Sequence, residues 1–137
     1  MEGLAQQLVL HGSLVLLSGF LGGIFFARAI KREKGEVAWR VVHAGASMGG
    51  IMLIALGPAI PQLALPPWEA SLIAWSLIVG VEVFVAGMVL AAVSGKRGLT
   101  RRGDSTNRLV WALYLLGSTL TLVGCTALAW GAATAGA

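Results

Sequence analysis

The segment WRVVHAGASMGGIMLIALGPAIPQL, residues 39–63, is an apolar run that carries its ionisable side chains at one end. Trp39 and Arg40 open the run, His43 follows three positions later, and small residues then recur on nearly every turn. The hydrocarbon core of a bilayer is about 30 Å thick, which about 20 helical residues cross. The segment therefore predicts a transmembrane helix with a histidine close to one membrane boundary.

Three further apolar blocks of similar length surround this segment. The four predicted helices cover residues 4–30, 38–63, 68–93 and 108–130. The chain has 137 residues, of which 57% are hydrophobic and 12% charged, and its mean hydropathy is +0.83. A soluble domain carries about a quarter of charged residues. We therefore predict an all-α integral membrane four-helix bundle, with residues 1–137 forming a single transmembrane domain.

The basic residues gather in two of the three connections. Those around the first connection are Arg28, Lys31, Arg32, Lys34 and Arg40, and those around the third are Lys96, Arg97, Arg101, Arg102 and Arg108. Cytoplasmic loops collect Lys and Arg, so the pattern predicts a multi-pass membrane protein with both basic connections inside and both termini outside. The pI near 10.0 is then a signal of topology, and no nucleic-acid partner is predicted.

Small residues predict close packing of the helices. Gly19 and Gly23 in the first block, and Gly45 and Gly49 in the second, have GxxxG spacing. Lipid provides no hydrophobic drive between helices, so close backbone approach has to supply the contact. Packing inside one chain is the simpler interpretation of any one glycine, and the single cysteine, Cys125, is also interpreted as a small packing residue. Four thin helices bury little, so we also predict self-association, with subunit interfaces that suit a flat cofactor.

Three ionisable side chains, His11, His43 and Glu82, lie within or at the edge of the apolar blocks. A charge at a helix centre costs about 2.5–3.5 kcal/mol on insertion scales, so such groups usually face the bundle interior and mark function. At 1.5 Å per residue, His11 lies roughly 25 Å from the basic boundary and His43 roughly 5 Å. The two histidines of one chain are therefore not expected to bind the same haem iron. His11 is predicted to bond a partner helix. Glu82 is protonated, paired with a histidine or serine, or part of a proton path.

His43 is the better candidate for a metal ligand. Ser47 and Gly50 share its helix face, which predicts a shallow slot beneath the imidazole. A haem needs one axial side chain, a flat apolar slot and basic groups for its propionates, and Arg40 lies about one turn away. The candidate cofactor-binding residues are thus His43, Arg40, Ser47 and Gly50. From these residues alone, a histidine bonded to the backbone of a neighbouring helix is the favoured interpretation.

Three short motifs resemble those of one known family. The segment HAGASMGGIMLIALGPAIPQLAL, preceded by Trp39, resembles the second-helix signature of the bacterial styrene oxide isomerase family. RGLT at 97–100, followed by Asn107 and Arg108, is similar to that family's loop between helices three and four, and HG at 11–12 to its first helix. The resemblance covers most of the chain, including the number of helices and the spacing of the loops.

The resemblance implies a homotrimer in the bacterial inner (cytoplasmic) membrane, with haem b at the boundaries between subunits and His43 as the axial ligand. It also implies ferric iron acting as a Lewis acid that opens an epoxide to an aldehyde, so the expected ligand is a small apolar molecule that contains oxygen. The chain departs from the family pattern at Gly49, where the isomerases have an asparagine, and at residues 88–93, where they have a tyrosine. Both of those side chains help to position the substrate.

Three hypotheses on function follow, and none assigns a catalytic side chain. The first is a haem b membrane enzyme that isomerises an epoxide to a carbonyl compound. The second is a non-enzymatic haem protein for electron transfer, gas sensing or haem handling, which the missing asparagine and tyrosine favour. The third is a small proton-coupled transporter built around Glu82, which the strong bias of basic residues disfavours.

Overall fold

The computed structural model describes residues 2–134, which form four long helices and one short 3-10 helix. The long helices are α1 (Glu2–Lys31), α2 (Glu36–Ala59), α3 (Pro67–Ser94) and α4 (Ser105–Thr134), and η1 (Ile60–Leu63) continues α2. Four segments, α1, α2 with η1, α3 and α4, are long and apolar enough to cross a membrane. No strand occurs within residues 2–134, and the predicted all-α membrane bundle is confirmed.

Prolines shape the connection between α2 and α3. Pro58 lies inside α2, and the chain changes to 3-10 geometry two residues later, at η1. Proline lacks the N–H that an α-helix needs and crowds the preceding turn, so the regular helix ends near it. Pro67 then occupies the first position of α3, where a missing N–H costs nothing. The turn between the two hairpins is consequently short and stiff.

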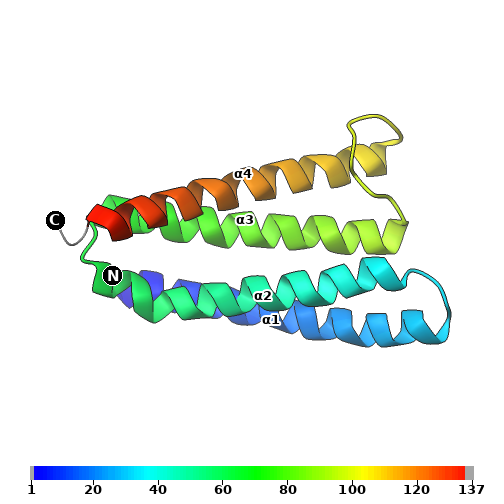
Figure 1. Ribbon diagram of the computed structural model, residues 1–137, viewed down its shortest axis with the longest axis horizontal. Coiled ribbons are helices and arrows are strands. Elements are labelled where there is room, and N and C mark those ends of the chain that lie inside the picture. The colour runs from blue at the N-terminus through cyan, green and yellow to red at the C-terminus, as the bar shows by residue number, and fades with distance from the viewer. Residues whose placement is uncertain (1, 135–137) are drawn as a thin grey trace.

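The helices form two antiparallel hairpins, α1 with α2 and α3 with α4, which lie side by side (Figure 1). Contact within each hairpin is close because glycines meet backbone. A Cβ on Gly50 would lie 2.6 Å from the backbone nitrogen of Leu16, and one on Gly117 would lie 2.7 Å from that of Phe84. These two glycines therefore pack within one chain, in the close backbone contact that lipid-embedded helices use.

The buried core lies between the hairpins and is centred on α3. Leu8 and Leu53 from the first hairpin pack with Ile73, Leu77 and Ile78 of α3, and all five are fully buried. Large apolar side chains also cover the outside, especially on α1 and α4. Such a surface suits lipid contact, since a soluble monomer seldom exposes large apolar patches.

Both connections that carry basic residues lie at one end of the bundle (Figure 1). The start of α1, the end of α4 and the turn between α2 and α3 lie at the other end. Gly95 ends α3 in the left-handed conformation, with φ of 70°, which glycine adopts without strain. The bundle is thus strongly polarised in charge along its long axis.

Candidate functional site

His43 lies on α2 and turns its imidazole toward α1. Its Nδ1 is 2.8 Å from the backbone carbonyl oxygen of Gly19. A carbonyl oxygen only accepts hydrogen bonds, so Nδ1 carries the proton, and in the neutral ring Nε2 keeps a free lone pair. This bond is the one expected of a structural histidine. It is also the bond by which a metal-ligating histidine is usually oriented.

Glycines on α1 make room for this ring. A Cβ on Gly23 would lie 3.0 Å from Nδ1 and 3.2 Å from Cε1 of His43. Any side chain at Gly23 would therefore push against the imidazole. The backbone of α1 and the hydrogen bond to Gly19 together hold the ring in one orientation.

The slot predicted beneath His43 is filled by α1. A Cβ on Gly19 would lie 2.6 Å from Oγ of Ser47, and one on Gly50 would lie 2.7 Å from the carbonyl oxygen of Gly12. Oγ of Ser47 is buried and has no hydrogen-bond partner among residues 2–134. Glycines that thin one helix face let the next helix approach and cover it, so the prediction of an open slot is wrong for a single chain. Contact of Ser47 and Gly50 with a cofactor stays a prediction.

Aromatic and basic side chains gather at the basic end, about one turn from His43. Arg40 is exposed there. Trp39 stacks on Phe25 with 4.6 Å between ring centroids, and the guanidinium carbon of Arg28 lies 5.7 Å from the centroid of Phe25. Guanidinium groups beside an apolar platform suit the carboxylates of an amphipathic ligand.

His11 and Glu82 form a hydrogen-bonded pair that links α1 to α3. Nδ1 of His11 is 2.6 Å from Oε1 of Glu82, and Trp75 meets the His11 ring edge-on with 6.1 Å between centroids. Bonding of His11 to another helix is therefore confirmed, as is the pairing of Glu82 with a histidine. The pair by itself does not decide whether Glu82 carries protons, because Glu and His side chains also form proton relays in membranes.

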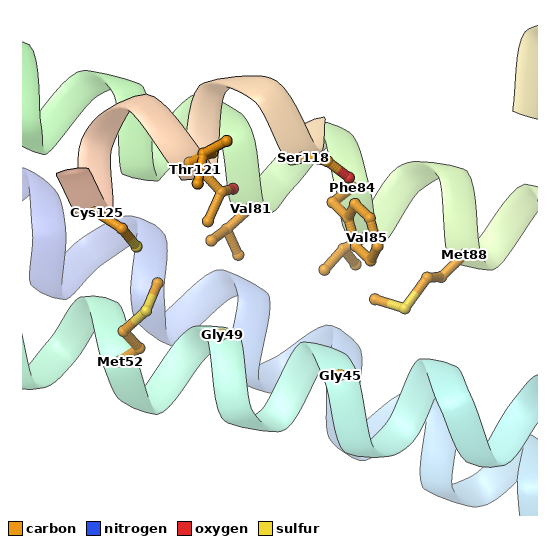
Figure 2. A pocket seen from close by; sticks show the side chains of 11 residues that line it. Gly45, Gly49, Met52, Val81, Phe84, Val85, Met88, Ser118, Thr121 and Cys125 are labelled. Carbon is orange, nitrogen blue, oxygen red and sulfur yellow. The ribbon is translucent and has the colours of Figure 1, made fainter. Parts of the chain in front are cut away.

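A cavity of about 450 Å³ lies between the hairpins (Figure 2). His43 is not among its lining residues. Gly45 and Gly49 form its wall on α2, and Phe84 and Met88 line it from α3. The third wall is α4, opposite α2 in this view. The lining is almost entirely apolar.

The wall that α4 contributes was not among the site residues predicted from the sequence. Ser118, Thr121 and Cys125 all line the cavity from that helix. Their spacing of three and four residues, which places side chains on one helix face, could have revealed them. The interpretation of Cys125 as a packing residue is wrong, because its side chain is exposed. The helix packs mainly on α3, so its remaining faces are not covered within one chain.

A second hollow, of about 760 Å³, opens at the basic end between the two connections. Met88 lines both this hollow and the 450 Å³ cavity. A Cβ on Gly45 would lie 2.9 Å from the terminal methyl of Met88, so the absence of a side chain there leaves room for the thioether. A flexible methionine therefore separates the membrane cavity from the basic end.

Asn107 organises the connection between α3 and α4. Its Oδ1 accepts a hydrogen bond from the backbone N–H of Gly98 at 3.0 Å. Its Nδ2 donates to the carbonyl oxygens of Thr100 at 2.9 Å and Arg102 at 2.7 Å. The RGLT and NR motifs are thus parts of one folded loop, with the asparagine as its centre.

Asp104 reinforces the same loop from outside the membrane-spanning segments. Its carboxylate pairs with the ammonium of Lys96 at 2.5 Å and accepts the backbone N–H of Asn107 at 2.8 Å. The hydrogen bond from Lys96, followed by that from Asn107, lowers the pKa of Asp104 below its ordinary value of 3.8. The carboxylate is therefore charged at neutral pH.

Comparison with known protein families identifies this chain's family. The model of the family described as styrene oxide isomerase matches residues 4–133. The matched region includes nearly all of the four helices and both basic connections. No curated protein gives a match. The match agrees with the resemblance carried by the HAG, RGLT and NR segments.

Proposed function

Because the chain belongs to the styrene oxide isomerase family, we propose that it is a haem b-binding membrane isomerase that converts a small apolar epoxide into a carbonyl compound. In that reaction one ring C–O bond breaks, and a hydride moves to the carbon that the oxygen has left. The other C–O bond then becomes the carbonyl double bond. The substrate's atoms and electrons are only rearranged, so no oxidant or reductant is consumed.

The orientation of His43 is the observation that carries the proposal. Its Nδ1–H is donated to the carbonyl oxygen of Gly19, and Gly23 leaves space for the ring. The neutral imidazole is thereby held with Nε2 free, as an axial ligand needs. Bound to that nitrogen, the ferric iron of haem b would supply a Lewis acid for the epoxide oxygen.

Arg40 is the residue that we propose for the haem propionates. It is exposed at the basic end of α2, one turn from His43. A guanidinium group can pair with a carboxylate through two parallel hydrogen bonds. Its position at the membrane boundary keeps the charged pair out of the hydrocarbon core.

We place the haem between neighbouring copies of a homotrimer. His43 is turned toward α1, whereas the 450 Å³ cavity lies on the side of α2 that faces α3 and α4. A single chain therefore does not bring the imidazole and the cavity face to face. In a cyclic oligomer the same interface can repeat head to tail, with His43 of one copy facing the cavity of the next.

The cavity suits an epoxide that opens with build-up of positive charge on carbon. Its apolar lining excludes water, which would otherwise trap the cation as a diol. Phe84 lines the cavity, and the face of an aromatic ring attracts positive charge. Tyr114 supports that ring, with 5.2 Å between the centroids.

A non-enzymatic haem protein is the second candidate, and the cavity wall on α2 favours it. The isomerases carry an asparagine at the position of Gly49, and here that position adds no polar group to the cavity. A haem pocket of this kind would bind a small gas or transfer an electron without holding a substrate. Incubation with epoxides separates the candidates, because carbonyl product excludes a purely non-enzymatic role.

We further propose that the basic end faces the cytoplasm of a bacterial inner membrane. The connections that carry Lys and Arg lie together at that end, as the positive-inside rule requires. Trypsin should cut the connection between α3 and α4 in inside-out vesicles and spare it in right-side-out vesicles. The reverse pattern would contradict this orientation.

An absorption spectrum tests the haem proposal. Protein purified in mild detergent should show a Soret band, which His43→Ala should abolish. His11→Ala is the matched control, because it removes the other histidine of the chain and should leave the band in place. The purified protein should also convert aryl or alkyl epoxides to carbonyl compounds, with product identified by mass spectrometry.

Two results would count against the proposal. A protein that stays colourless after expression with excess haem would exclude haem binding. A coloured protein that yields no carbonyl product from any epoxide, in the ferric or the reduced state, would exclude the isomerase and leave the second candidate.

A further inference from the structure

The polar groups of the 450 Å³ cavity all come from one helix. The walls on α2 and α3 consist of glycines, aliphatic side chains, thioethers and a phenyl ring. Only α4 offers hydroxyl or thiol groups, from Ser118, Thr121 and Cys125 (Figure 2). A volume near 450 Å³ falls within the range of about 300–1,000 Å³ that small-molecule sites occupy. The cavity therefore has the size of a binding site and polarity on one side only.

The hydroxyls of Ser118 and Thr121 are not used by their own helix. Hydroxyls in transmembrane helices usually bond the carbonyl one turn earlier, as Thr119 does to Leu115 at 2.8 Å and Thr134 does to Trp130 at 3.0 Å. Within residues 2–134, neither Ser118 nor Thr121 makes such a bond. A hydroxyl left unpaired in apolar surroundings costs free energy, which a hydrogen bond to a bound molecule would offset.

Thr121 is also held in place. A Cβ on Gly80 would lie 2.6 Å from Oγ1 of Thr121, so this glycine accommodates the hydroxyl. Position 80 is buried in the contact between α3 and α4, where a larger residue would displace the threonine. The contact with α3 therefore holds Thr121 rigidly at the edge of the cavity.

We propose that this cavity binds small, mostly apolar molecules with one acceptor oxygen, which accepts hydrogen bonds from Ser118 and Thr121. No residue of the lining carries a charge, so ionic ligands are excluded by the cost of desolvation. The inference deepens the proposed function, on which it rests for the class of ligand. It assigns the recognition of oxygen to α4, opposite the bare wall of Gly45 and Gly49.

Protection of Cys125 from a maleimide provides the test, because it is the single cysteine and lines the cavity. Full-length protein in nanodiscs is treated with N-ethylmaleimide, and the rate of modification is followed by mass spectrometry. The ligands are 2,3-dihydrobenzofuran and indane, which have the same shape and differ in one ether oxygen. Neither ligand needs haem or turnover to bind, so a colourless or inactive protein still gives an answer.

We expect dihydrobenzofuran to protect Cys125 at about three- to tenfold lower concentration than indane, as one or two neutral hydrogen bonds would give. The double variant Ser118→Ala, Thr121→Val should remove this preference. Thr119→Val is the matched control and should keep it, since that hydroxyl bonds its own helix.

Three results would overturn the inference. Equal protection by the two ligands in the unmodified chain would show that no hydroxyl recognises oxygen. A preference that survives in the double variant would place the donor elsewhere. Absence of protection by either ligand would show that the cavity does not bind them.

Discussion

Replacing Gly50 by alanine tests the packing that orients His43. Gly50 meets α1 backbone to backbone: a Cβ there would lie 2.6 Å from the nitrogen and 2.8 Å from the Cα of Leu16. Ordinary van der Waals contact begins at 3.4 Å, so the two helices would have to separate by about 0.8 Å at this point. Backbone atoms inside helices cannot swing aside as a side chain can.

The cost follows from this displacement. Forcing an extra carbon into a close-packed contact usually costs about 1–3 kcal/mol. Alanine favours a helix over glycine by about 0.8–1 kcal/mol, which offsets part of that cost. We therefore expect Gly50→Ala to lower the free energy of unfolding by up to about 2 kcal/mol.

Gly45→Ala is the matched control on the same helix. Its Cβ would meet only the terminal methyl and sulfur of Met88, at 2.9 and 3.0 Å, and these can rotate into the cavity. Helix propensity then dominates, and the variant should be as stable as the unmodified chain or slightly more so. Since both substitutions gain the same propensity, the difference between Gly50→Ala and Gly45→Ala isolates the packing cost.

Reversible unfolding by SDS in mixed micelles, followed by circular dichroism, measures the difference. Protein concentration and haem occupancy have to be held constant, because association and ligand binding add to apparent stability. Equal free energies of unfolding for the two alanine variants would refute the backbone contact between α1 and α2. The same result would remove the support for the fixed orientation of His43.

Three further predictions concern the hairpin link and the basic loop. Glu82→Leu should lower the free energy of unfolding by about 0.6–1.7 kcal/mol, as loss of an interhelical hydrogen bond does. The double variant Glu82→Leu, His11→Leu should lose less free energy of unfolding than the two single variants lose together. Additive losses would contradict a hydrogen bond between the two side chains. The pKa of Asp104 is lowered by folding, so its stabilisation of the loop is present above the ordinary pKa of 3.8 and is lost as pH falls through the lower folded value. Cutting of the loop by pepsin should then become faster, relative to Asp104→Asn, as pH falls. Asp104→Asn lacks the carboxylate and should be cut quickly at each pH tested. Lys96→Met removes the main partner of Asp104, so its cutting rate should lie closer to that of Asp104→Asn. Asn107→Ala removes three hydrogen bonds and should lower the free energy of local unfolding of the loop by at least about 2 kcal/mol. Backbone amides of the loop should then exchange about 30-fold faster. Unchanged exchange would contradict the organising role of Asn107.

The number and position of the helices could be predicted from the sequence because they depend on properties read along the chain. Apolar length is set by the thickness of a bilayer, and the blocks at 4–30, 38–63, 68–93 and 108–130 each contain most of one helix. Basic residues mark the connections, and both connections do lie at one end. His43 could be singled out because an ionisable side chain in an apolar block is costly.

The sequence could not show which helix faces meet. A helix in lipid is apolar all round, so it lacks the polar stripe that marks the outside of a soluble helix. The face of Ser47 and Gly50 therefore looked like an open slot, and only the structure shows that α1 covers it. The pairing of His11 with Glu82, 71 residues apart, depends in the same way on how the hairpins dock.

The membrane bundle, its charge polarity and the histidine that we propose as a metal ligand could all be predicted from the order of residues along the chain. Tertiary structure alone decided the atom of His43 that is left free, the partner of Glu82, and the cavity with its hydroxyl wall on α4. The physical reason is that membrane insertion depends on the total apolarity of each segment. Packing depends on the close fit of small residues, and each helix has small residues on several faces. Only the positions of the backbones show which of these faces are in contact.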